Sequence, residues 1–214
     1  MTMRGLLDRL GGGRRDRAQA HTLEAFAAAI LLVAGLTFAL QATAVTPLSA
    51  STSNQHIENQ QRAVAGDLLA TSADNGDLES ALLYWDPEAD SGDGAFVGTG
   101  EDESYTEGGP PNDFGETLNR TFLDRSIAFN VDIRHGDRNE NRTEVVDMGR
   151  PSDNAVTARR SVALADDANL TAPGYEDTTL RQLEGDPGAF YVEDDVVAGD
   201  VYDYVEVRIV VWRM

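Results

Sequence analysis

A long stretch without charged side chains lies near the start of the chain. No residue from Ala25 to Gln55 is charged, and Ala25–Val45 is almost wholly apolar over 21 residues. At about 1.5 Å per residue, a helix of that length reaches about 30 Å, the thickness of the hydrocarbon core of a bilayer. The pattern predicts a transmembrane helix region over 19–48, with a buried core helix of a soluble protein as the alternative.

Helical spacing continues beyond this stretch, but the apolar residues then keep to one face. Ile57, Val64 and Leu68 recur at helical intervals among polar and charged residues, which predicts an amphipathic helix over 49–72. A second, shorter helix is expected from Asp77 to Trp85, with its apolar residues directed to a core.

Farther along, apolar and polar residues alternate with the period of a β-strand. Four such runs, over 127–133, 143–148, 155–165 and 205–211, predict four strands. The last run is so apolar that we expect it inside a sheet, because an exposed edge of this kind aggregates. A helix packed across an antiparallel sheet is the simplest architecture for these elements. The expected fold class is therefore α+β: a long N-terminal helix, transmembrane and then amphipathic, packed on an antiparallel β-sheet head.

The segment between the helices and the strands has a different composition. Residues 86–113 are rich in Asp, Glu, Gly and Pro and predict an irregular acidic loop. Asp86 and Glu88 have the spacing that opens an EF-hand calcium loop, but Ser91 stands where that loop needs Gly and Val97 where it needs an acid. We therefore expect a solvated surface loop and no metal site.

The overall charge narrows the possible functions. The chain has 37 acidic and 17 basic residues, a formal net charge of −20; all the basic residues are Arg, and Cys is absent. The lack of Cys excludes disulfides and Cys-ligated metal sites. The strongly negative charge disfavours nucleic-acid binding. Lys-free, acid-rich composition is typical of proteins adapted to high salt, where ions screen the self-repulsion.

The basic residues gather at the start of the chain. Residues 1–24 carry five Arg and three acids, a net charge of +2, whereas the other 190 residues carry 34 acids and 12 Arg, a net charge of −22. Because Arg-rich flanks stay on the cytoplasmic side of a membrane, we expect the N-terminus in the cytoplasm and the body outside. The expected organisation is a basic cytoplasmic leader (1–18), the transmembrane helix region (19–48), the amphipathic helix (49–72) and an acidic extracytoplasmic head (73–214).

The sequence leaves three fates open for the apolar segment. It is a permanent single-pass anchor, or a secretory signal cut before Val45, where Ala42-Thr43-Ala44 gives the small-x-small pattern of a cleavage site. The third fate depends on the residues that precede the segment.

Those residues form a basic run, Arg14-Arg15-Asp16-Arg17, then the small residue Ala18, then a polar stretch that ends at Glu24. This arrangement resembles the class III signal of archaeal type IV pilin-like proteins, and the layout of the chain resembles pilin-like membrane proteins of halophilic archaea. The resemblance implies a cut by a prepilin peptidase on the cytoplasmic side after Ala18, which makes Gln19 the new N-terminus. The family usually has its Glu at the fifth mature position. Glu24 is sixth after that cut and fifth after a cut behind Gln19, so both registers stay open.

Glu24 itself has two interpretations. A carboxylate at the edge of hydrocarbon is costly unless it finds a partner. The resemblance implies that Glu24 pairs with the N-terminal amine of a neighbouring subunit and takes part in assembly. Alternatively, Glu24 is a helix-end residue that reaches into the headgroup region.

Three glycosylation sequons, Asn-x-Thr, lie in the part expected outside the membrane. Their acceptors are Asn119, Asn141 and Asn169. We expect them on the surface of an extracytoplasmic, glycosylated head.

Catalytic motifs give no support for an enzyme. The three histidines, His21, His56 and His135, are far apart in the sequence, and no nucleophile elbow, phosphate loop or zinc-protease motif occurs. We expect no catalytic residues, no cofactor and no metal.

These patterns together predict a structural protein of the cell surface. We expect a single-pass, membrane-anchored, pilin-like subunit whose partners are membrane lipid, a prepilin peptidase and other pilin-like subunits, reached through the apolar helix. The alternative is an uncleaved single-pass surface protein whose extracytoplasmic head binds a partner or a small solute.

Overall fold

The structure is a computed structural model with two compact units, Met1–Asn54 and Gln55–Met214. For 4–18 and 42–54 only the backbone is described. The described residues are 4–89, 93–99, 104–136, 141–184, 189–193 and 199–214.

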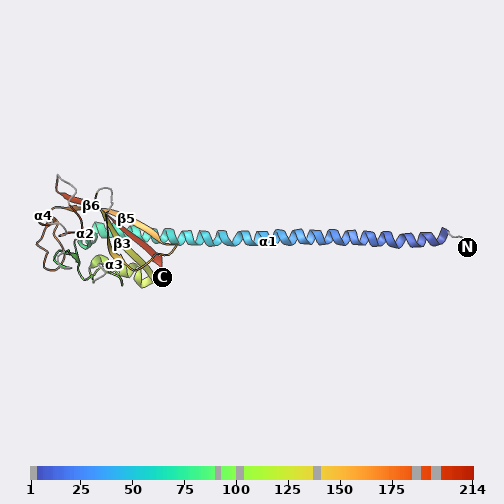
Figure 1. Ribbon diagram of the computed structural model, residues 1–214, viewed down its shortest axis with the longest axis horizontal. Helices are drawn as coiled ribbons and strands as arrows, with labels where there is room; N and C mark the ends of the chain where they lie inside the picture. The colour runs from blue at the N-terminus through green and yellow to red at the C-terminus, as the bar shows by residue number, and fades with distance from the viewer. Residues whose placement is uncertain (1–3, 90–92, 100–103, 137–140, 185–188, 194–198) are drawn as a thin grey trace. The chain divides into compact units, whose positions relative to one another are not determined.

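The first unit is helical throughout its described part. It belongs to helix α1, Arg4–Asn75, whose residues from Gln55 onward lie in the second unit (Figure 1). Within it, Gln19–Gln41 is long and apolar enough to cross a membrane. Ala and Leu, which favour helices, dominate this stretch, and Gly35 is of the kind that membrane helices tolerate. The predicted apolar helix is confirmed.

In the second unit, α1 is amphipathic and packs on the head. Its residues Ala65, Leu68 and Leu69 are buried in the same core cluster as the strands of the sheet. At Gly76, which has a φ of 84°, the chain turns through the left-handed region that glycine adopts readily. The short helix α2, Asp77–Leu82, follows and buries Leu78, Ala81 and Leu82.

The sheet of the head has four antiparallel strands in the order β4-β3-β6-β5 (Figure 1). Ile209 of β6 lies opposite Val131 of β3 on one side and Ala158 of β5 on the other. The last strand is thus central, as its apolar run predicts. The strands are β3 Ile127–His135, β4 Asn141–Asp147, β5 Val156–Ala165 and β6 Val201–Arg213.

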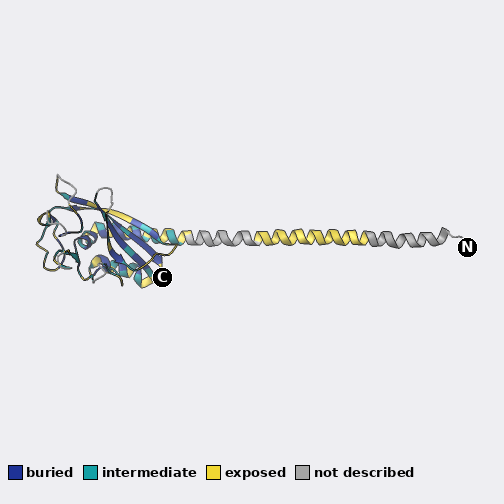
Figure 2. Ribbon diagram, viewed as in Figure 1, coloured by how far each residue is buried: buried dark blue, intermediate teal, exposed yellow. Residues whose placement is uncertain are grey.

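The two faces of this sheet differ in what they contact. The inner face carries Phe129, Val131 and Ile133 of β3 with Val207 and Ile209 of β6, all buried against α1 (Figure 2). The opposite, outer face carries mostly polar residues, with a small apolar cluster of Ala128, Val210 and Trp212 at one end. The fold class is α+β, as the sequence predicts.

The segment 86–113, predicted as an irregular loop, consists mostly of turns and bends in its described residues. It contains one short strand pair, in which β1 (Trp85–Asp86) pairs with β2 (Ala95–Phe96). The Trp85 ring lies 5.2 Å from that of Phe96, and its Nε1 donates to the Ala189 carbonyl at 3.0 Å. These two buried rings fix the strand pair to the core of the head. Residues 90–92 and 100–103 lie outside the described part.

Three short helices were not predicted. They are α3, Asp113–Thr121, the 3-10 turn Leu123–Arg125, and α4, Leu180–Leu183. Asn112 caps α3 by accepting the Gly115 N–H at 3.0 Å, and Phe114 and Leu118 enter the core. The cap and the apolar residues at intervals of four, Phe114, Leu118 and Phe122, together stabilise this helix.

Candidate functional site

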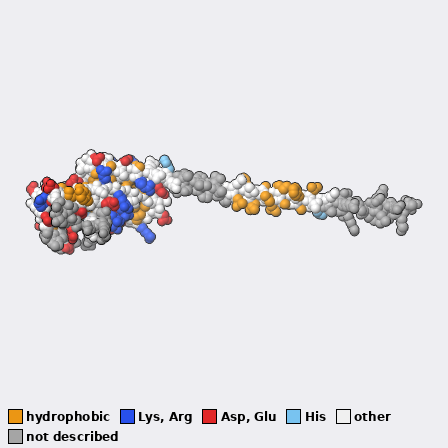
Figure 3. All heavy atoms as spheres, turned by 90° about the horizontal axis from the view of Figure 1, so that it is seen from above, with side chains coloured by type: hydrophobic (Ala, Val, Ile, Leu, Met, Phe, Trp, Pro, Cys, Tyr) orange, Lys and Arg blue, Asp and Glu red, His pale blue; other side chains and the backbone are white. Residues whose placement is uncertain are grey.

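The apolar part of the first unit is an exposed surface. Every side chain from Gln19 to Gln41 is exposed, for example 74% for Leu32 and 75% for Phe38 (Figures 2 and 3). Of the eleven exposed large apolar side chains among the described residues, nine lie between Leu23 and Leu40. Contiguous apolar surfaces of this kind mark membrane or protein interaction sites.

The two hydroxyl groups within this stretch bond to the helix itself. The Thr37 hydroxyl donates to the Val33 carbonyl at 2.7 Å, and the Thr22 hydroxyl donates to the Gln19 carbonyl at 2.9 Å. Such bonds make hydroxyl side chains compatible with hydrocarbon. The uncharged part of the surface, after Glu24, is therefore compatible with lipid or with another apolar helix.

The residues predicted for processing and assembly lie at the start of this surface. Gln19 is exposed, and Ala18 lies in α1 with its side chain outside the described part. Glu24 is exposed, and its Oε2 lies 3.6 Å from Nδ1 of His21, one helical turn earlier. Because Glu24 is open to its surroundings, its carboxylate can reach a cation outside its own helix.

The three sequon asparagines lie on separate parts of the head and differ in accessibility. Asn119, in α3, is half-buried, and its Oδ1 accepts the Gly109 N–H at 2.8 Å. Asn141, at the start of β4, and Asn169, which bridges to Thr179, are exposed. The sequence pattern treats the three alike, whereas their contacts separate Asn119 from the other two.

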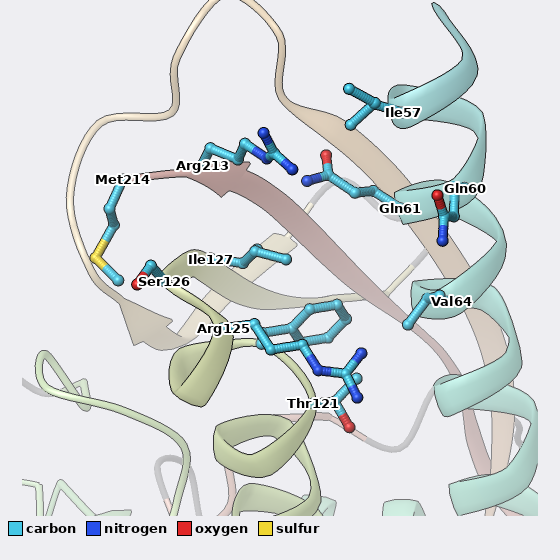
Figure 4. Close-up of a pocket in the computed structure, with 11 residues that line it drawn as sticks. Ile57, Gln60, Gln61, Val64, Thr121, Arg125, Ser126, Ile127, Arg213 and Met214 are labelled. Atoms are coloured by element: carbon cyan, nitrogen blue, oxygen red, sulfur yellow. The ribbon is translucent and has the colours of Figure 1, made fainter. Parts of the chain in front are cut away.

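The second unit contains a groove of about 450 Å³ that the sequence did not indicate (Figure 4). Its apolar wall comes from Ile57 and Val64 of α1 together with Ile127 of β3. The guanidinium groups of Arg125 and Arg213 lie at its rim. An apolar wall with two cations at the edge suits a small solute that has both an apolar part and an anionic group.

The outer face of the sheet carries a charge cluster that sequence reasoning also missed. Asp132 is buried, and its carboxylate is approached by the Nε atoms of Arg142, Arg134 and Arg208 at 3.5, 3.6 and 3.7 Å. Three guanidiniums offset part of the desolvation cost of this carboxylate, but neither of its oxygens accepts a hydrogen bond from the described residues. Each residue belongs to an alternating strand pattern, but only the strand register brings the four together.

Further charged residues extend this cluster across the sheet. Arg142 also binds Glu144 at 2.6 Å, and Arg159 of β5 lies 3.7 Å from Glu206 of β6. We call this surface the outer charged face; it consists of Asp132, Arg134, Arg142, Glu144, Arg159, Glu206 and Arg208.

Two carboxylates, those of Asp86 in β1 and of Glu88 just after it, lie close to Tyr175. Desolvation, hydrogen bonds with Glu88 and Asp86, and the charges of both carboxylates raise the pKa of Tyr175 to about 12. The loop that carries Tyr175 is fixed to α2 because the Thr171 hydroxyl donates to the Ser80 carbonyl at 2.6 Å. The arrangement brings Tyr175 to two acids that precede it by about 90 residues in the sequence.

Comparison with known proteins gives a family but no function. The model of a family described as "Family of unknown function (DUF7288)" matches residues 17–211, which include both the apolar helix and the head. Comparisons with curated proteins and with solved structures found no match. The chain belongs to DUF7288, a family of unknown function.

Proposed function

We propose that the protein is a membrane-anchored, pilin-like surface subunit that assembles with other subunits through its apolar helix. The observation that carries this proposal is the exposure of every side chain from Gln19 to Gln41, in a chain whose second unit has a core of its own. Apolar surface of this extent is stable only in lipid or against other apolar helices.

The proposed mechanism has two stages. In the first, the apolar helix holds the protein in the membrane, with Arg14, Arg15 and Arg17 on the cytoplasmic side and the acidic head outside. In the second, a prepilin peptidase removes the leader, and the helices of several subunits pack together. Glu24 then pairs with the new N-terminal amine of a neighbour, which satisfies both charges at the edge of an apolar environment.

The N-terminal sequence of the mature protein, obtained by peptide mass mapping from native membranes, tests the processing step. A start at Gln19 or Ala20 is the expected result. A start at Val45 means a secreted domain and an intact Met1 means a simple anchor, and either result contradicts the proposal.

Assembly through the helix is tested on detergent-solubilised protein. We expect oligomers in analytical ultracentrifugation, and we expect the variant Glu24→Gln to reduce them because it removes the charge that pairs with the neighbouring amine. Glu58→Gln is the matched control, since Glu58 lies in α1 within the head. A monomeric protein that is unaffected by Glu24→Gln contradicts the assembly role.

The groove in the second unit favours one further candidate function, an uncleaved surface protein whose head binds a small anionic solute. Arg125 and Arg213 would contact the anionic group, and Ile57 and Val64 the apolar part. Thermal shift with a series of short-chain fatty acids tests this function. A rise in melting temperature that Arg213→Gln abolishes supports it, and an unchanged melting temperature contradicts it.

A further inference from the structure

The groove of the second unit is free of acidic side chains, although the protein is strongly acidic. The chain has a formal net charge of −20, yet none of the described residues that line the groove is Asp or Glu. Glu58 and Asp124 are next to lining residues in the sequence but do not line the groove themselves. An anionic solute therefore meets less repulsion here than over most of the head.

The two arginines of the groove lack the ion pairs that other arginines of the head make. Arg125 and Arg213 are exposed, and among the residues that the structure describes no Asp, Glu or terminal carboxylate lies within ion-pair distance of either. A guanidinium has five N–H donors, so both side chains keep donors available for a ligand. Six other arginines of the head lie within ion-pair distance of an acid: Arg134, Arg142, Arg159, Arg160, Arg181 and Arg208.

The strand register explains why a cation lies at one end of this groove. Val207, Ile209 and Val211 of β6 are buried on the inner face of the sheet, and the alternation of side chains puts Arg213 on the same face. Arg213 lies opposite Ile127, the first residue of β3. The next inward position after three apolar residues thus carries a guanidinium at the edge of the core.

The second cation approaches from another element and from the other end. Arg125 belongs to the 3-10 turn that precedes β3, and its side chain lies on the side of Thr121 (Figure 4). In the same view, Ile127 lies between the side chains of Arg125 and Arg213. The two guanidiniums are therefore separated by an apolar surface.

The middle of the groove is held in place by the core. Val64 of α1 and Ile127 are partly buried and pack against the main core cluster, to which the buried Phe122 belongs. All three line the groove. The groove thus combines an apolar middle with a cation at each end.

We propose that this groove binds an elongated solute that has an apolar middle and an anionic group at each end, of the class of linear dicarboxylates. The proposal rests on the solute-binding function suggested for the groove, and it adds that Arg125 and Arg213 each contact a separate anionic group. The planar fork of a guanidinium matches a carboxylate, and the apolar middle contacts the methylene chain of the solute.

Isothermal titration calorimetry of the full-length protein in lipid nanodiscs tests this specificity, with empty nanodiscs as the blank. The probes are succinate, suberate and dodecanedioate, each compared with the monocarboxylate of equal length: butyrate, octanoate and dodecanoate. We expect the best dicarboxylate to bind about tenfold or more tightly than its monocarboxylate, because it gains a second charged hydrogen bond. Burial of apolar area alone predicts the reverse order, since the monocarboxylate is the more apolar molecule.

Three arginine variants show whether both ends of the groove contribute. We expect Arg125→Gln and Arg213→Gln each to lower the affinity for the best dicarboxylate to about that of the matched monocarboxylate. Arg150→Gln is the control, because Arg150 is exposed and does not line the groove, and it should leave the affinity unchanged. The melting temperature of each variant without ligand shows whether it is folded.

The outcomes separate this inference from the function on which it rests. Equal affinities for monocarboxylates and dicarboxylates overturn the two-ended specificity alone. An equal loss of affinity in Arg150→Gln also overturns it, because the loss then follows net charge rather than position. Absence of binding by every acid of the series overturns the inference together with the solute-binding function.

Discussion

Two stretches of α1, 19–41 and 55–75, are both rich in Ala and Leu but differ in how far these residues are buried. Residues 19–41 are apolar on all sides, and every side chain is exposed. Residues 55–75 have apolar residues on one side only, and Ala65, Leu68 and Leu69 are buried against the sheet. An amphipathic helix can satisfy its apolar stripe within its own domain, whereas a helix that is apolar all round needs an apolar surrounding. The comparison therefore shows that the first stretch, unlike the second, does not bury its apolar residues within the head, which is compatible with a membrane anchor or a signal sequence.

The largest expected difference in the free energy of unfolding comes from replacing one leucine of each stretch by alanine. Leu69 is 1% exposed, and we expect Leu69→Ala to lower the free energy of unfolding of the head by about 2–5 kcal/mol, because it leaves a cavity. Leu31→Ala, at a position 73% exposed, should change it by less than about 0.5 kcal/mol. Chemical denaturation of the detergent-solubilised protein measures both. Equal losses would mean that the two stretches do not differ as described.

A charged residue introduced in the middle of the first stretch tests whether lipid surrounds this helix. Leu32→Arg should disfavour membrane insertion by about 2.5–3.5 kcal/mol, so that protein moves from the membrane to the soluble fraction. Gln55→Arg, at an exposed position of the second stretch, is the control and should leave the distribution unchanged. Carbonate extraction of membranes measures this distribution. Retention of Leu32→Arg at the wild-type level contradicts a lipid surrounding.

The comparison extends from apolar residues to the asparagines of the head. Asn119→Ala removes the acceptor of the Gly109 N–H and should lower the free energy of unfolding by about 1 kcal/mol. Asn141→Ala, at an exposed position, should have no measurable effect. If the head lies outside the membrane, peptide mass mapping should find glycans on Asn141 and Asn169 but none on Asn119. A glycan on Asn119 of the folded protein contradicts this assignment.

The smallest expected effect is a tyrosine titration, which only the head can show because 19–41 contains no Tyr. Desolvation, hydrogen bonds with Glu88 and Asp86 and their charges raise the pKa of Tyr175 to about 12. Since the pKa is raised above its ordinary value of 10, the associated stability is complete below pH 10 and is lost as the pH rises towards 12. The ultraviolet absorbance of tyrosinate should follow this titration, and Glu88→Gln should lower the pKa. An unchanged titration in Glu88→Gln contradicts the contact.

Most of the elements could be predicted from local patterns because their side chains point in a regular order towards the core or towards the solvent. The strand β6 is an example: Val205, Val207 and Ile209 recur at every second position, and the structure places all three in the core. The helix α3 was not predicted, although Asn112 is a typical N-cap and Phe114, Leu118 and Phe122 recur at intervals of four residues and are buried. It is short, contains Gly115 and follows a segment rich in Gly and Pro, so its helical pattern spans too few turns to stand out, and burial against the rest of the head stabilises it.

The candidate sites also differ in whether the sequence alone or only the tertiary structure determines them. The sequence by itself determined the apolar helix, the position of Glu24 at its edge and the contrast between a basic start and an acidic body, since hydrophobicity and charge are properties of the residues. Only the tertiary structure decided that Asp132 is covered by three arginines, that Asp86 and Glu88 meet Tyr175, and that Asn119 is bonded while Asn141 is exposed. These relations depend on strand register and loop packing, which join residues far apart in the chain and leave no periodic trace in its sequence.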